Sequence, residues 1–219
     1  MVSPATLKFL RSLKKNNNKV WFDANRQTYE DCRAQYFLFI ESLLKELKKI
    51  DPSLVDLEAK KCMFRINRDI RFSKNKDPYK TNFGSYFSKG GKNIACAGYY
   101  LHIEPGASFV AGGYWMPEAQ DLKKIRTEID YCLEEFKEII HKRDFKLKFR
   151  ELDSEYSLSR PPQGFEADHP GIEWLKLKSF TVSAPLSDSE ITQTGIEKKI
   201  INHFKVLVPF IHFLNRSLD

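Results

Sequence analysis

The sequence predicts an α+β fold in which a central, mainly antiparallel sheet is flanked by long N-terminal, middle and C-terminal helices. Apolar residues recur at helical spacing near both ends of the chain and in its middle, whereas apolar and polar residues alternate between residues 63 and 115. Strands clustered between helices are typical of the α+β class. No internal repeat or low-complexity linker divides the chain, so we expect a single domain over residues 1–219.

The first predicted elements are helices. Ser3 followed by Pro4 has the pattern of an N-cap and a first helical position, and leucines follow at helical spacing until the polar run 16–18. A long amphipathic helix is predicted over about Asp23–Lys49. Pro52 disfavours the helical conformation at Asp51, so this helix should end there.

Three strands are predicted next. From Met63 to Phe72 the period changes to two, which indicates a strand, and Ser73–Gly91 is expected to be a loop. Alternation returns over Ala95–Glu104. After a Pro-Gly turn, Ser108–Trp115 is predicted to return as the neighbouring strand.

The last third of the chain is predicted to be mostly helical. A helix is expected over Pro117–His141, a strand over residues 145–152, and a further strand over Ser179–Val182. A capping-box pattern occupies residues 187–190, and an apolar helix is predicted over Ile196–Leu214.

Positive charge is concentrated in one segment of the chain. Residues 60–92 contain ten basic and two acidic residues, a net charge of +8, whereas the remaining residues have 26 basic and 27 acidic side chains. Like charges at this density repel one another unless an anion or interleaved acids offset them. The segment is therefore the expected functional site.

Cysteine usage and hydropathy predict a cytoplasmic protein that does not enter a membrane. The four cysteines lie far apart, at Cys32, Cys62, Cys96 and Cys132, without a close pair for zinc, and reduced, mostly buried thiols are expected. No stretch approaches the roughly 20 apolar residues needed to cross a bilayer. The first residues also lack the apolar run of a secretory signal.

Three arginines within seven residues predict an anion-binding array. On a strand, Arg65, Asp69 and Arg71 would point to one face, where guanidinium groups can hold a phosphate or carboxylate through paired hydrogen bonds. Arg68 would fall on the apolar face, which suggests that it is paired or partly buried. The structural alternative is an Arg–Asp ion-pair network that only joins the sheet to its helices.

The neighbouring residues extend this predicted ligand site. Lys76, Tyr79 and Lys80 follow in a loop whose glycines would allow it to close over a ligand. Tyr100 and Trp115 lie in the later strands and can stack on a planar ligand, although core or edge packing is the commoner role of such residues.

Asp69, His102 and Glu104 are the candidate catalytic residues, as groups that transfer protons. His102 and Glu104 lie two residues apart and so share one strand face. Two such ligands do not make a metal site, and a hydrogen-bonded sheet histidine is the structural alternative. No metal site is predicted.

The basic segment also carries a recognisable pattern. Residues 65–80 read Arg-x-x-Arg-Asp-x-Arg-Phe-x-x-Asn-Lys-x-Pro-Tyr-Lys, and further matching motifs occur at 98–106 and 112–118. In these features, and over nearly its whole length, the chain resembles the bacterial and fungal family catalogued as domain of unknown function 2461. The resemblance implies an intracellular protein of about this length and names no activity, cofactor or partner.

Three hypotheses of function remain open. The first is a protein, enzymatic or not, that binds an anionic small molecule such as a phosphate, carboxylate or nucleotide in a basic pocket. The second is a nucleic-acid-binding protein that uses the same segment, and the third is a structural or interaction domain without a ligand. No phosphate-binding loop, dinucleotide fingerprint, nucleophile elbow or zinc-protease motif occurs, and the sequence indicates no cofactor.

Overall fold

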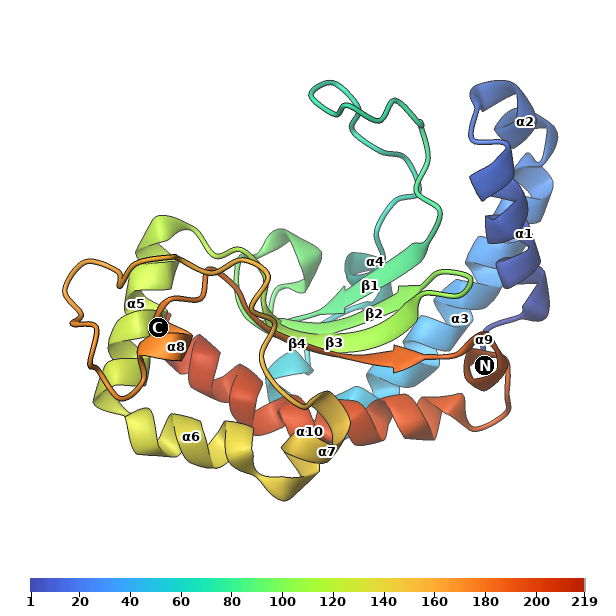
Figure 1. Ribbon diagram of the computed structural model, residues 1–219. Helices are drawn as coiled ribbons and strands as arrows, with labels where there is room; N and C mark the ends of the chain where they lie inside the picture. The colour runs from blue at the N-terminus through green and yellow to red at the C-terminus, as the bar shows by residue number, and fades with distance from the viewer. Residues whose placement is uncertain (219) are drawn as a thin grey trace.

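A four-stranded antiparallel sheet forms the centre of the molecule (Figure 1), so the predicted α+β class is confirmed. The structure is a computed structural model that describes residues 1–218. The strands follow one another across the sheet in chain order: β1 (Phe83–Phe87), β2 (Gly98–Ile103), β3 (Ser108–Tyr114) and β4 (Phe180–Leu186).

Helices precede the strands, separate β3 from β4, and follow β4 in the chain. At the N-terminal side these are α1 (Pro4–Lys15), α2 (Lys19–Ala24), α3 (Arg26–Ile50) and the short α4 (Ala59–Cys62). After β3 come α5 (Ala119–Tyr131), α6 (Leu133–His141), α7 (Arg143–Phe149) and α8 (Ile172–Leu175). The chain ends with α9 (Asp188–Ile191) and α10 (Ile196–Arg216).

Helices α3 and α10 cover one face of the sheet, and the opposite face is left open over its central strands (Figure 1). The two-residue period of β2 explains this arrangement. Tyr99, Leu101 and Ile103 are fully buried toward the helices, whereas Tyr100 and His102 point to the other face. The sheet thus has one core face and one face that is free to form a site.

Close contact between α10 and the sheet depends on a glycine. A Cβ atom at Gly112 would lie 2.6 Å from Cδ1 of Leu207 in α10. Helix α3 contributes a polar contact on the same face, because the Tyr36 hydroxyl lies 3.0 Å from Oγ of Ser85. These contacts hold the sheet firmly against its helical layer.

The predicted strand at Met63–Phe72 is wrong. Only isolated bridges occur there, between Met63 and Ser85 and between Asn67 and Tyr79. The second bridge closes the base of a loop, residues 67–79, here called the arm, which projects away from the sheet (Figure 1). The alternating pattern misled the prediction because its apolar side chains do not share a buried face: Phe72 is 95% exposed.

Two further elements differ from the prediction. Strand β1 lies inside the segment that was expected to be a loop, because Gly84 and Ser85 obscure the alternation of its buried phenylalanines. Residues 145–152, expected to be a strand, begin within helix α7. Phe145 and Phe149 are both buried and lie four residues apart, a spacing that suits a helix.

The predicted long helices are present, but two of them are each divided into two helices. The Ser3 side chain accepts a hydrogen bond from the amide of Ala5 at the start of α1, and the capping box that precedes α9 is present. The helix predicted from Asp23 consists of α2 and α3, which meet at Asn25. The helix predicted over 117–141 is likewise interrupted, at Cys132.

Within residues 1–218, no helix is both long enough and apolar enough to pass through a bilayer.

Candidate functional site

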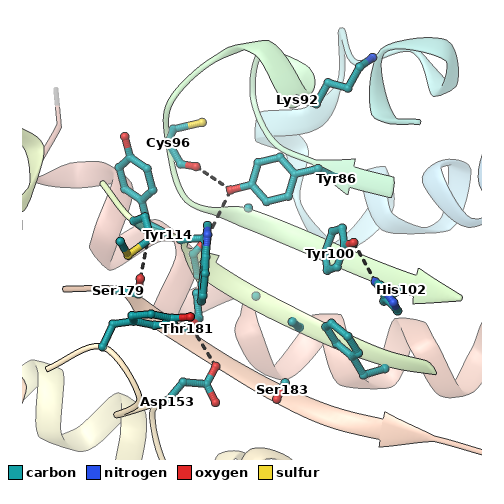
Figure 2. A pocket seen from close by; sticks show the side chains of 18 of the residues that line it. Tyr86, Lys92, Cys96, Tyr100, His102, Tyr114, Asp153, Ser179, Thr181 and Ser183 are labelled. Atoms are coloured by element: carbon teal, nitrogen blue, oxygen red, sulfur yellow. Dashed lines mark hydrogen bonds between the residues drawn. The ribbon is translucent and has the colours of Figure 1, made fainter. Parts of the chain in front are cut away.

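A cavity of about 1000 Å³ lies on the open face of the sheet (Figure 2). Its floor is made by alternate residues of the four strands, which point away from α3 and α10. These floor residues are Tyr86, Gly98, Tyr100, His102, Phe109, Ala111, Gly113, Thr181 and Ser183. A cavity of this size accommodates a small-molecule ligand.

Small residues give the floor its depth and hold its aromatic rings in place. Tyr100 pairs across the sheet with Ala111, and His102 pairs with Phe109, on which its ring stacks at 4.7 Å between centroids. A Cβ atom at Gly84 would lie 2.8 Å from the Tyr100 hydroxyl. Glycine at residue 84 therefore leaves the space into which the Tyr100 ring extends.

The walls of the cavity come from segments far apart in the chain. Trp115 follows β3 and packs edge-on against Tyr156, with ring centroids 5.2 Å apart. The segment containing Tyr156 is held at the β4 edge, because the Asp153 amide donates to the Thr181 carbonyl at 2.8 Å. On the β1 side, the Tyr86 hydroxyl donates to the Cys96 carbonyl at 2.6 Å (Figure 2).

A chain of hydrogen bonds joins Glu104, His102 and Tyr100. The Tyr100 hydroxyl lies 3.0 Å from Nδ1 of His102, and Nε2 of His102 lies 3.2 Å from Oε2 of Glu104. The amide nitrogen of Asn82 also lies 3.4 Å from Nδ1. The Glu104 carboxylate can only accept a hydrogen bond, so the single proton of the neutral imidazole is on Nε2 and Nδ1 is an acceptor. The Tyr100 hydroxyl must then donate to Nδ1.

Burial and hydrogen bonding determine the charge states of Glu104, His102 and Tyr100. It lowers the pKa of His102, against the opposing influence of the Glu104 carboxylate. Burial also disfavours ionisation of Glu104, but hydrogen bonds from His102, Lys14 and Thr81 outweigh it and lower the pKa of that carboxyl group. Burial, with the negative charge of Glu104, raises the pKa of Tyr100 to about 12. At neutral pH Glu104 is therefore a carboxylate, His102 a neutral imidazole and Tyr100 a protonated phenol.

Lys80 supplies a cation at the β1 side of the cavity. Its Nζ lies 5.1 Å from the centre of the Phe64 ring, and its side chain makes no ion pair or hydrogen bond with any other residue in 1–218. Burial, followed by the charge of Arg65, lowers the pKa of Lys80. A half-buried ammonium group without an acidic partner is an unfavourable arrangement that an anionic ligand would relieve.

Acidic residues lie at the other side of the cavity. Glu118, Asp153 and Glu155 line it near the end of β3 and the β4 edge. Burial raises the pKa of Asp153, partly offset by the hydrogen bond from the Thr181 hydroxyl. The cavity is thus basic on its β1 side and not uniformly basic.

The three arginines do not line this cavity. Arg71 forms an ion pair with Asp69 on the arm, with Nη2 2.7 Å from Oδ2. Arg68 is partly buried and donates to the carbonyl of Asp77 at 3.0 Å and to Oγ of Ser73 at 3.3 Å. Arg65 is exposed at the base of the arm. The shared strand face that would have aligned these side chains does not exist.

Two other predicted ligand residues also lie outside the cavity. Lys76 is exposed on the arm and donates to the carbonyl of Ile70. Tyr79 is buried, and its ring stacks on Phe22 with centroids 3.9 Å apart. The side chain of Asn17 bonds both the amide and the carbonyl of Tyr79, so this tyrosine anchors the arm to the helices.

The structure brings together a smaller group of the predicted residues. Lys80, Tyr100, His102 and Trp115 line the cavity, and Glu104 reaches it through His102. The sequence analysis missed Asn82 and Asp153. Asn82 belongs to the segment expected to be a loop, and no local pattern indicates that Asp153 lies beside β4. Within residues 1–218, no three His, Cys, Asp or Glu side chains form a group that could hold a metal ion.

Comparison with known proteins identifies a family for nearly the whole chain. Residues 5–213 match the family described as "Conserved hypothetical protein (DUF2461)". No curated protein and no solved structure matches the chain. The function must therefore be argued from the cavity itself.

Proposed function

This chain belongs to the family described as "Conserved hypothetical protein (DUF2461)", and from the geometry of its cavity we propose that it binds an anionic small molecule. The ligand's negatively charged group lies beside Lys80, and its apolar part rests on the aromatic floor and walls. The observation that carries this proposal is the Lys80 ammonium, half-buried in a large cavity without an acidic partner in residues 1–218.

The composition of the cavity favours a ligand with a planar or apolar body. Tyr100 and Phe109 line the floor, and Trp115 lines a wall, so apolar and aromatic surface dominates the space next to Lys80. Ligand sites combine such surface with a few polar groups that fix orientation. A carboxylate or phosphate attached to a ring meets both requirements, and a nucleotide belongs to the same class.

Calorimetric titration with matched pairs of compounds tests the proposal. We expect benzoate and phenyl phosphate to bind more tightly than benzamide and benzyl alcohol, which lack the negative charge. Lys80→Met keeps the length of the side chain and removes its charge. It should weaken binding of the anions about 10-fold or more, since hydrogen bonds to charged groups contribute roughly 1.5–3 kcal/mol.

Lys76→Met is the matched control, because its ammonium is exposed on the arm and lies outside the cavity. Its affinities should equal those of the unaltered protein. Equal binding of neutral and anionic compounds, or equal losses in the two variants, would contradict the proposal.

Binding of nucleic acid is the second candidate, and the arm is the observation that favours it. Arg71, Lys74 and Lys76 are exposed there around Phe72, a side chain without cover from the rest of the molecule. Exposed aromatic rings among cations are suited to stacking on the bases of a single strand. Affinity for single-stranded DNA that falls steeply with salt would support this candidate over the first.

The proposed compartment is the cytoplasm. All four cysteines are free, which agrees with a reducing environment.

A further inference from the structure

Tyr100 ends a hydrogen-bonded chain that has the order carboxylate, imidazole and hydroxyl. We propose that Tyr100 is a catalytic nucleophile, whose oxygen attacks the acyl carbon of an anionic ester or thioester while His102 accepts its proton. This inference rests on the proposed function, because the cavity that binds the anion also delivers the acyl group. The same order of groups activates the serine of the Ser-His-Asp triad.

The direction of the hydrogen bonds suits this role. Nε2 of His102 donates to the Glu104 carboxylate, so Nδ1 is an acceptor and the phenolic proton already points at the base that would take it. Within residues 1–218, no donor bonds to the Tyr100 oxygen, which leaves its remaining lone pair available to an electrophile. Tyrosine is among the side chains that form covalent intermediates when an adjacent base activates them.

Glu104 acts as the positioning residue of this chain. Its Oε1 accepts hydrogen bonds from Lys14 Nζ at 3.2 Å and from Thr81 Oγ1 at 3.0 Å. Oε2 remains for Nε2 of His102. A carboxylate fixed in this way holds the imidazole in the tautomer whose Nδ1 is unprotonated, and it stabilises the imidazolium that forms when the proton arrives.

The proposed reaction consumes one ester or thioester and one water molecule. The Tyr100 oxygen forms a bond to the acyl carbon, its proton moves to Nδ1 of His102, and the bond from the acyl carbon to the leaving oxygen or sulfur breaks. The imidazolium then protonates the leaving group and becomes neutral again. Water hydrolyses the acyl-tyrosine with His102 as base, which restores the phenol.

The chemistry of a phenol narrows the substrate class. An acyl-tyrosine is an aryl ester. It forms readily only from an acyl donor whose leaving group departs as easily as a phenol, such as a thiol or another phenol. Lys80 reaches the same region, since its Nζ lies over Phe64, and the Phe64 ring lies 6.3 Å from that of Tyr100. The expected substrate is therefore an activated ester or thioester that carries a carboxylate or phosphate.

A covalent probe tests the proposal without knowledge of the natural substrate. The probe 4-(fluorosulfonyl)benzoate combines a carboxylate with an electrophilic sulfonyl group, and attack by Tyr100 would release fluoride and leave a sulfonate ester. We expect mass spectrometry to find the adduct on Tyr100. His102→Gln should slow its formation about 100-fold, within the range typical of general base catalysis.

Two variants and a pH profile separate chemistry from misfolding. Tyr131→Phe removes a tyrosine that is 81% exposed and should leave the labelling rate unchanged. Gly84→Ala places a methyl group against the Tyr100 hydroxyl and should slow labelling while the protein still unfolds cooperatively. Labelling of the unaltered protein should rise as pH increases through the titration of His102. Glu104→Gln should move this rise to lower pH, because the imidazolium loses its carboxylate partner.

A neutral probe distinguishes failure of this inference from failure of the proposed function. If phenylmethanesulfonyl fluoride labels Tyr100 in a His102-dependent way but 4-(fluorosulfonyl)benzoate does not, the nucleophile stands and the anion site is wrong. If the unreactive 4-sulfamoylbenzoate binds in a Lys80-dependent way but neither fluoride labels Tyr100, the inference is overturned. Labelling that is unchanged by His102→Gln overturns it as well.

Discussion

His102 shows how much of the site depends on the surroundings of a single residue. Its ring stacks on Phe109, its Nδ1 accepts from Tyr100, and its Nε2 donates to Glu104. These contacts fix the orientation and the tautomer of the imidazole before any ligand arrives. Such preorganisation is what a proton-transfer group requires.

The low pKa of His102 predicts a stability that depends on pH. Burial favours the neutral imidazole in the folded protein, so its pKa there lies below the ordinary value of 6.5. Between these two values the unfolded chain binds more protons. The unfolding free energy should therefore keep the full contribution of the neutral His102 above about pH 6.5. It should decrease as pH falls below that value, by at most about 1.4 kcal/mol per pH unit for one proton.

Urea unfolding between pH 8 and pH 5 checks this prediction. His102→Gln should give a shallower dependence of the unfolding free energy on pH. The remaining dependence should shrink further in the double variant with His203→Gln, because burial also lowers the pKa of His203. A dependence as steep in His102→Gln as in the unaltered protein would refute it.

At the residue scale, the sequence predicted side-chain direction only where the strand itself was predicted correctly. Tyr100, His102 and Glu104 share one face because each lies two residues from the next on β2 or at its end. The same reasoning applied to Arg65 and Arg71 was wrong, because no neighbouring strand pairs with their segment beyond isolated bridges. An alternation of apolar and polar residues predicts which side chains would share a face if the segment were a strand. It does not predict whether the strand forms.

The arm illustrates how an element can be attached to the fold without contributing much to its core. Its base is closed by two backbone hydrogen bonds, from Arg68 to Pro78 and from Lys80 to Ile66. Tyr79 fixes it to the helices through Phe22 and Asn17. Between these contacts the chain is mostly exposed, so it buries little apolar surface.

We predict that shortening the arm leaves the fold intact. Replacing residues 69–78 with Asn-Gly-Thr, which gives a two-residue hairpin turn whose closing residue has an N–H, should change the unfolding free energy by less than about 1 kcal/mol. Binding of benzoate should persist because Lys80 remains. If the second candidate function is correct, binding of single-stranded DNA should disappear. A cooperative unfolding transition shifted by several kcal/mol would show instead that the arm supports the core.

At the element scale, predictions succeeded for helices with caps and failed where the apolar pattern was short. Helices α1 and α10 were predicted because their periodic runs are long, and the start of α1 also carries a recognisable cap at Ser3. Helix α7 was taken for a strand, and β1 for a loop, because each presents only a few apolar residues. The pairing of β1 with β2, which buries Phe83 and Phe87, is a tertiary contact that no local pattern contains.

Asp51 connects elements of the whole molecule on the helical face of the sheet. This fully buried carboxylate accepts hydrogen bonds from Tyr99 of β2 at 2.7 Å and from His212 of α10 at 3.0 Å. It follows directly after α3, and the Ser53 hydroxyl also donates to it. Burial opposes its ionisation, but these hydrogen bonds outweigh that effect and lower the pKa of Asp51.

Removing the charge of Asp51 should destabilise the whole fold. In Asp51→Asn the new amide hydrogens would oppose the donors of Tyr99 or His212, and we expect a loss of about 2–4 kcal/mol in chemical unfolding. Asp56→Asn, at an exposed position nearby, is the control and should change stability by less than about 0.5 kcal/mol. Similar losses in both variants would argue against a connecting role for Asp51.

The cavity is formed by consecutive strands and by a wall that comes from a distant part of the chain. Strand β2, which carries Tyr100 and His102, lies between β1 and β3, its neighbours in the chain, whereas the wall at Asp153–Tyr156 comes from a distant connection. The stretch from 150 to 170 can therefore be replaced without rebuilding the strands. A variant in which residues 150–170 are replaced should bind different ligands, while the reactivity of Tyr100 should stay unchanged.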